Sequence, residues 1–246
     1  MFSSIWNTLL YEPLLNALAF LVSVVPGGDV GIAVIILTIL VKIALFPLSQ
    51  RSIRSQAAMN LLAPELKKIK DSGASKEEQA RLTFELYKKN KTNPFSGCLL
   101  VLIQIPIIFA LYYVFFRGIN FDRELLYSFI HIPDKVNMVF LGVINIGEKS
   151  LILAILAGVS QYFQAHFMPK PATSSATPGT FAESFAKSMH TQMKYVLPVF
   201  IFLILYTDFL GISLSGAIAL YFITSNIFAI GQQIYLKRTK VLIPAV

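Results

Sequence analysis

The chain has 246 residues, of which 55% are hydrophobic and 14% are charged, and its mean hydropathy is +0.66. This composition excludes an ordinary water-soluble domain and favours an integral membrane protein with several spans. The net charge of +8 would suit nucleic-acid binding, but most cations flank apolar segments, where they encode topology, so we expect no sequence-specific nucleic-acid contact. The single cysteine, Cys98, excludes an intramolecular disulfide.

The N-terminal segment, residues 1–28, is apolar but carries aromatic and polar residues around Pro13. No Lys or Arg precedes position 42, so the segment lacks the pattern of a secretory signal peptide and we expect it to be retained. Two interpretations remain open: a sixth span, or a helix lying on the outer membrane surface. The aromatic residues and the central proline favour the second, an interfacial amphipathic helix.

Five later segments have the apolar composition and roughly the length of membrane spans. The predicted spans are 29–49, 93–117, 149–168, 194–209 and 210–235. The expected fold class is therefore an all-α integral membrane protein. The fourth span is short for a bilayer core of about 30 Å, so we expect a locally thinned membrane and a hairpin with the fifth span around Asp208 and Gly211.

Four further segments connect or follow the spans. They are predicted as a helical hairpin over 50–92, a loop over 118–148, a flexible linker over 169–193 and a tail over 236–246. In the hairpin, Asp71-Ser72-Gly73 separates two amphipathic segments, and Ser75 followed by Glu78 predicts a capping box at the second helix. A solvated connector is the alternative interpretation, although loops of this length are usually functional.

The distribution of basic residues predicts the orientation. Segments 49–95, 169–194 and the tail carry sixteen Lys and Arg residues, whereas the segments on the other side of the spans carry four. Because positive charge accumulates on the cytoplasmic side, the hairpin, the linker and the tail are expected in the cytoplasm and the 118–148 loop outside. The N-terminus is then outside and the C-terminus is cytoplasmic.

Lys42 lies inside the first predicted span, six residues before Leu48. A cation within a span is costly unless water or a partner reaches it, and such residues are usually functional. The alternative is that the ammonium snorkels to the interface, which is roughly 9 Å of helix away. No acidic residue lies within the spans near Lys42, so its field is available to an incoming acidic group.

Polar residues in several spans are candidates for lining a wet cavity with Lys42; they include Thr38, Gln104, Gln161, Ser225 and Asn226. Thr38 lies one helical turn from Lys42. For each of these residues, hydrogen bonding between helices is the competing explanation. The sequence contains no catalytic, nucleotide-binding or metal-binding motif, so we expect neither an enzyme nor a cofactor or metal.

Several stretches, in the same order and at the same spacing, resemble the YidC insertases, a family that includes the mitochondrial Oxa and thylakoid Alb proteins. The matching stretches are Gly31…Thr38-Ile39-Leu40-Val41-Lys42…Phe46-Pro47-Leu48, Ser55…Met59…Leu62-Ala63-Pro64-Glu65-Leu66, Tyr87-Lys88…Asn93-Pro94-Phe95-Ser96-Gly97-Cys98, Leu102-Ile103-Gln104-Ile105-Pro106-Ile107…Ala110-Leu111-Tyr112, and Ala219-Leu220-Tyr221-Phe222…Ser225-Asn226…Gln232-Gln233. The stretch around Asn93 to Tyr112 is the most specific.

The resemblance implies five spans around a hydrophilic groove that is open to the cytoplasm and to lipid and closed to the outside. In this family a groove cation, normally Arg, attracts acidic residues of the translocated tail, and Lys42 stands at that position. Lysine keeps the charge but lacks the planar bidentate fork of arginine. The expected groove residues are Lys42, Thr38, Gln104, Gln161, Tyr221, Phe222, Ser225 and Asn226.

The resulting hypothesis is a non-enzymatic membrane protein insertase and chaperone in a bacterial cytoplasmic (plasma or inner) membrane, of the form without the large periplasmic domain. Its expected partners are nascent membrane proteins and the lipid bilayer, with the ribosome and the Sec translocase as further candidates. The alternative is a small channel or transporter in which Lys42 selects anions. We find no convincing internal repeat of the kind that transporters often carry.

Overall fold

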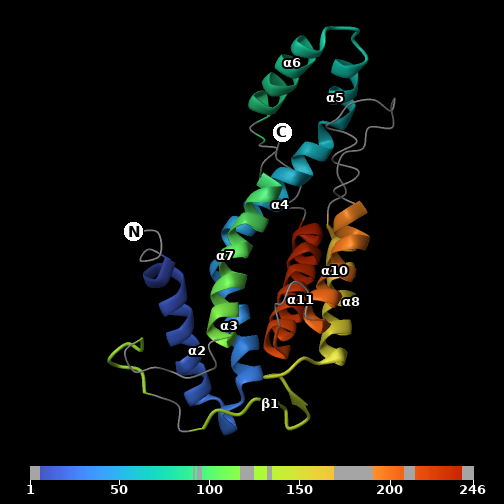
Figure 1. Ribbon diagram of the computed structural model, residues 1–246. Coiled ribbons are helices and arrows are strands. Elements are labelled where there is room, and N and C mark those ends of the chain that lie inside the picture. The colour runs from blue at the N-terminus through green and yellow to red at the C-terminus, as the bar shows by residue number, and fades with distance from the viewer. Residues whose placement is uncertain are drawn as a thin grey trace.

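The computed structural model describes residues 6–90, 92, 96–116, 125–131, 135–168, 191–207 and 214–239. These residues are mostly helical, and the helices form an elongated bundle from which residues 63–89 project at one end (Figure 1). By length and composition, two of the described helices are each able to cross a membrane, and a bent pair makes a third candidate span. Shorter apolar helices accompany them.

The N-terminal helix lies along the bundle. The π-helical turn η1 (Asn7–Tyr11) continues directly into α2 (Glu12–Val24), and together they form one of the helices of span length. Leu15, Leu18 and Val22 of α2 are buried in the hydrophobic core. α2 packs against α3 (Val30–Ala44) and α7 (Ser96–Phe116), while Phe20 and Val24 stay exposed on its other side. Both interpretations of residues 1–28, an interfacial helix and a sixth span, stay predictions.

The first predicted span, 29–49, consists of two helices. α3 (Val30–Ala44) ends at Leu45, and α4 (Phe46–Leu61) starts in a new direction, bent by 58°. Pro47 explains the break, since its nitrogen has no proton to donate to the preceding turn. The same proline is tolerated in the first turn of α4, where amides have no intrahelical partner.

The α4–α6 arm, residues 46–89, begins with α4, which packs against α7, and carries α5 and α6 beyond the bundle (Figure 1). A second break at Leu62 separates α4 from α5 (Ala63–Lys70). α5 lies beside α6 (Lys76–Lys89), whose Leu86 is buried. Between the two helices Gly73 has a φ of +69°, a conformation that glycine adopts without strain.

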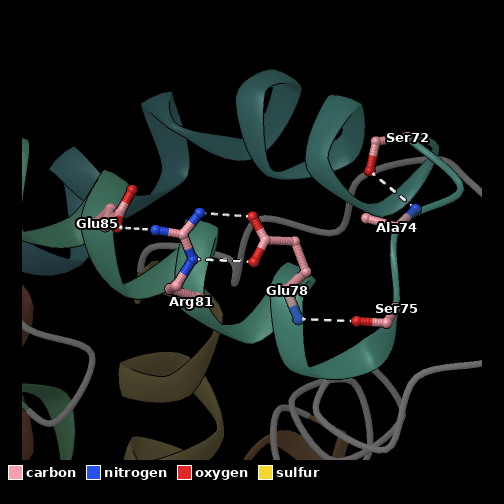
Figure 2. Close-up of polar contacts among 6 residues, drawn as sticks. All are labelled: Ser72, Ala74, Ser75, Glu78, Arg81 and Glu85. Atoms are coloured by element: carbon pink, nitrogen blue, oxygen red, sulfur yellow. Dashed lines mark hydrogen bonds and ion pairs between the residues drawn. The ribbon is translucent and has the colours of Figure 1, made fainter.

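The start of α6 has the cap predicted from Ser75. The Glu78 amide donates to Ser75 Oγ over 3.3 Å, which confirms the N-cap (Figure 2). In a full capping box the Glu78 carboxylate would also accept from the Ser75 amide. In the structure this carboxylate accepts from Arg81, which also donates to Glu85. The Arg81 hydrogen bonds lower the pKa of Glu78. Because both side chains are exposed to solvent, these bonds contribute little to stability. The contribution is present above the unfolded-state pKa of Glu78 and is lost as the pH falls through its folded-state pKa.

Replacing Ser75 by Ala removes the oxygen that satisfies the Glu78 amide. The expected cost is about 1 kcal/mol, confined to the start of α6, so amide hydrogen exchange in its first turn should become roughly fivefold faster. Ser72→Ala is the matched control, because the Ser72 hydroxyl donates to the Ile69 carbonyl outside α6. Equal exchange at Glu78 in the two variants would contradict the capping role.

The rest of the bundle contains α7 (Ser96–Phe116), α8 (Leu151–Phe167), η3 (Gln192–Val196) leading into α10 (Leu197–Tyr206), and α11 (Gly216–Arg238). α8 packs against α10 and α11, and α11 also packs against α3. Gly158 permits the close crossing of α8 and α10, since a Cβ there would lie 3.1 Å from the Pro198 carbonyl oxygen. The linker up to residue 190, the turn at Asp208 and Gly211, and the tail from residue 240 lie outside the described residues.

A small antiparallel sheet lies at the end of the bundle opposite the α4–α6 arm (Figure 1). Strand β1 (Val139–Phe140) pairs with β2 (Ile144–Asn145), so the all-α expectation is wrong for this part of the 118–148 segment. Strands of two residues are too short to show an alternating pattern in sequence. The sheet is attached to α3 through Asp29, whose carboxylate accepts from the Ile32 and Leu141 amides over 3.1 and 2.8 Å.

Candidate functional site

Lys42 has a hydrogen-bond partner on another helix. Lys42 lies in the last turn of α3, and its Nζ donates to Oε1 of Gln104 on α7 over 3.1 Å. A neutral amide oxygen satisfies one of the three ammonium protons but does not cancel the charge. The contact therefore fixes the position of the cation and leaves its positive field available.

The helices around this contact carry no opposing charge. α3, α7, α8 and α11 contain neither Asp nor Glu. Within the part of the chain that the structure describes, Lys42 forms no ion pair, and Arg81 pairs with its carboxylates in α6. An incoming acidic group would therefore meet Lys42 without competition from a carboxylate on these four helices.

Thr38 lies one turn before Lys42 but is occupied within its own helix. Its Oγ1 donates to the Val34 carbonyl over 2.6 Å, and the residue is 3% exposed. This geometry matches the competing explanation, a hydroxyl satisfied inside the bundle. Its place on a wet groove stays a prediction.

A second polar contact joins α11 to α8. Asn226 Nδ2 donates to Ser160 Oγ over 3.0 Å, and Ser160 in turn donates to the Ala157 carbonyl over 2.9 Å. Asn226 is buried, so this is the interhelical hydrogen bond that competes with the wet-groove interpretation. Ser160 was not among the predicted residues, because no local pattern assigns a serine to a partner 66 positions away.

The remaining predicted groove residues are buried or partly buried on α8 and α11. Gln161 donates to Gln164 over 3.1 Å within α8. Tyr221 is 1% exposed, and its ring meets that of the partly buried Phe222 edge-on, with centroids 5.7 Å apart. Ser225 is buried on α11.

The interhelical hydrogen bonds of the predicted residues lie at two places. One contains the Lys42–Gln104 contact between α3 and α7, and the other contains Asn226, whose hydrogen bond to Ser160 joins α11 to α8. Among the described residues, no hydrogen bond joins one place to the other. A single groove that contains both stays a prediction.

Another interhelical contact was not predicted. Gln232 of α11 accepts from Ser49 Oγ over 2.9 Å, and its Nε2 approaches the Phe46 carbonyl at 3.5 Å. Both partners directly follow the break between α3 and α4, so the buried Gln232 attaches the end of α11 to this bend. The sequence shows a polar residue inside a span, but no local signal names partners more than 180 positions away.

The helix surfaces define the class of protein. Large apolar side chains are exposed along several helices, a cation is held at a contact between two of them, and a basic arm extends from one end. The described residues include no group of side chains able to hold a metal ion. These features are typical of a helical integral membrane protein. The model of the 60Kd inner membrane protein family matches residues 20–242, and the chain belongs to this family.

Individual relatives carry the name membrane protein insertase YidC. The relative from Anaeromyxobacter sp. (strain Fw109-5) is 32% identical over 87% of this chain and 34% of its own length. The relative from Methylobacillus flagellatus is 31% identical over 95% of this chain and 37% of its own length. "Membrane protein insertase YidC 1" of Lactococcus lactis subsp. lactis is 28% identical over 99% of this chain and 80% of its own length. The chain thus spans about a third of the first two relatives and most of the third.

Proposed function

We propose that this chain is a membrane protein insertase that moves the short polar tails of newly made membrane proteins across the bilayer and helps their apolar segments enter lipid. The name of its relatives supports this class. The observation that carries the mechanism is the Lys42–Gln104 contact, which holds an unneutralised cation between two helices. Nascent membrane proteins and lipid are the proposed partners, and the ribosome and the Sec translocase remain candidates.

The proposed architecture has five spans, α3, α7, α8, α10 and α11, around a hydrophilic groove that is open to the cytoplasm and to lipid and closed outward. The α5–α6 pair is the proposed cytoplasmic hairpin that receives the nascent chain. The excess of basic residues supports a cytoplasmic C-terminus. If α2 is a sixth span, only the N-terminus changes side, and the orientation of the other spans is unaffected.

The proposed driving forces are electrostatic capture and burial in lipid. A carboxylate about 4 Å from the Lys42 ammonium gains roughly 4 kcal/mol at an effective dielectric of about 20, which offsets part of its desolvation. The short α10 reduces the hydrocarbon distance that a polar tail crosses. Transfer of the substrate's apolar helix into lipid supplies the remaining free energy, so no nucleotide is required. Thr38, Gln161, Tyr221, Phe222, Ser225 and Asn226 complete the proposed groove.

Reconstitution separates this function from the alternative of a small channel or transporter. Liposomes that contain the purified protein should insert a single-span substrate with a short acidic tail, measured by protease protection of the tail, without added nucleotide. Ion flux in the absence of substrate should equal that of protein-free liposomes. Flux of ions or solutes without insertion would reject the insertase and support the channel.

A further inference from the structure

A cluster of aromatic rings lies at the end of α8 that is next to the C-terminal part of α11. Tyr162 and His166, one turn apart on α8, stack with ring centroids 6.4 Å apart, and His166 meets Phe167 edge-on at 6.0 Å. The ring of Tyr195 on η3 lies 6.1 Å from that of Tyr162. This ring cluster, residues 162, 166, 167 and 195, contains none of the eight predicted groove residues.

Two lysines are positioned by the ring cluster. Lys194 Nζ lies 5.1 Å from the ring centroid of Tyr195 and 5.7 Å from that of Tyr162. Lys237 Nζ, in the last turn of α11, lies 5.7 Å from the ring centroid of Phe167 and donates to the Phe167 carbonyl over 3.3 Å. Each ammonium therefore has a fixed location and unused N–H donors.

The described helices at this end of the bundle carry charge of one sign. α8, η3, α10 and α11 contain no Asp or Glu. Their basic residues include Lys194 on η3 and Lys237 and Arg238 on α11. Neither Lys194 nor Lys237 forms an ion pair with any residue that the structure describes. Cations that are held by aromatic rings, and that pair with no carboxylate among the described residues, are complementary to an anionic group.

The surface next to the ring cluster indicates which kind of anion would bind there. Ile155, Val159 and Phe163 recur at helical spacing on α8 and are exposed, so an apolar surface leads up to the ring cluster. Tyrosines beside basic residues at the end of an apolar helix are typical of the level at which lipid headgroups lie. An anion with an attached hydrocarbon tail fits both parts of this surface, whereas inorganic phosphate fits only the cations.

We propose that the ring cluster together with Lys194 and Lys237 binds the headgroup phosphate of an anionic phospholipid. The two ammoniums donate to the phosphate oxygens, and an acyl chain follows the exposed face of α8. The bound lipid holds the ends of α8 and α11 at the membrane interface. This site is separate from Lys42 and does not depend on the insertase activity.

Native mass spectrometry of the full chain tests this site. The protein in detergent is mixed with equal amounts of phosphatidylglycerol, which is anionic, and phosphatidylethanolamine, which is zwitterionic. The wild type should retain phosphatidylglycerol in preference, and Lys194→Gln and Lys237→Gln should each lower its retention about fivefold. Lys194→Arg combined with Lys237→Arg should restore retention, because arginine keeps both the charge and the ring contact.

The matched control is Lys88→Gln with Lys89→Gln, which changes the charge of α6 by the same amount at exposed positions. An equal loss of phosphatidylglycerol in the two double Gln variants would overturn the site and reduce it to a general charge effect. Unchanged retention of phosphatidylglycerol in Lys194→Gln with Lys237→Gln would also overturn the site. Full displacement of the lipid by excess inorganic phosphate would overturn it as well. Circular dichroism checks that each variant is folded, and if the double variant is not, the single variants decide.

Discussion

Lys42→Glu is expected to abolish insertion of substrates whose translocated tail is acidic, while Lys42→Arg keeps most of the activity. Reversing the charge replaces an attraction of roughly 4 kcal/mol by a similar repulsion, so the loss should exceed about 100-fold. The fold should tolerate the change, because the Gln104 amide that accepts from Lys42 can rotate and donate to a carboxylate instead. The measurement is complementation, together with protease protection of the tail, in cells depleted of their own insertase.

Two controls separate charge from shape. Lys42→Gln should be intermediate, because the amide remains polar but neither attracts nor repels the tail. A substrate whose acidic residues are changed to Lys should be inserted better by the Lys42→Glu variant than by the wild type, since the interaction is then attractive again. Normal insertion of the acidic tail by Lys42→Glu would refute the electrostatic mechanism and leave Lys42 with a structural role.

Gly28→Ala is expected to destabilise the protein by about 2–5 kcal/mol, which combines left-handed backbone strain with overpacking. Gly28 has a φ of +65°, and a Cβ there would lie 2.1 Å from the Lys135 carbonyl oxygen. The backbone cannot move aside easily, because the Asn137 amide donates to the Gly28 carbonyl and the Val30 amide to the Asn137 carbonyl. The yield of folded protein and its melting temperature in detergent should both fall.

The neighbouring glycine provides a matched control. Gly27 has a φ of +72°, but a Cβ there would have no other atom within 4 Å. Gly27→Ala therefore carries the backbone strain without the clash and should cost only about 1–2 kcal/mol. If the two variants melted at the same temperature, the close approach between Gly28 and the 135–137 segment would not contribute to stability.

Local signals in the sequence account for much of the helical structure. Ser75 and Glu78 predicted the start of α6, because a helix cap depends on residues three positions apart. Pro47 was visible within the first predicted span, yet the apolar run continues across it, and the separation of α3 from α4 went unpredicted. Residues 7–24 are helical and of span length, but apolar composition does not distinguish a span from a helix on the membrane surface, so both interpretations stay predictions.

In the candidate site, too, the sequence indicates single residues and the structure shows which of them are in contact. Lys42 stands out in sequence because an ionisable residue inside a span is rare and costly. Gln104 was a candidate too, but its hydrogen bond with Lys42 depends on how α3 and α7 are rotated against each other. Those rotations are set by packing over the whole length of the helices, which adjacent residues do not encode.

By itself, the sequence determined that this is a helical membrane protein, which segments are apolar enough to span, and that one cation lies among them, because these properties follow from composition and local spacing. Only the tertiary structure decided that Gln104 holds Lys42, that Ser160 binds Asn226, and that Gln232 attaches α11 to the bend after α3. These contacts join residues between 62 and 183 positions apart, and they form only when the packing of apolar faces has fixed the rotation and depth of each helix.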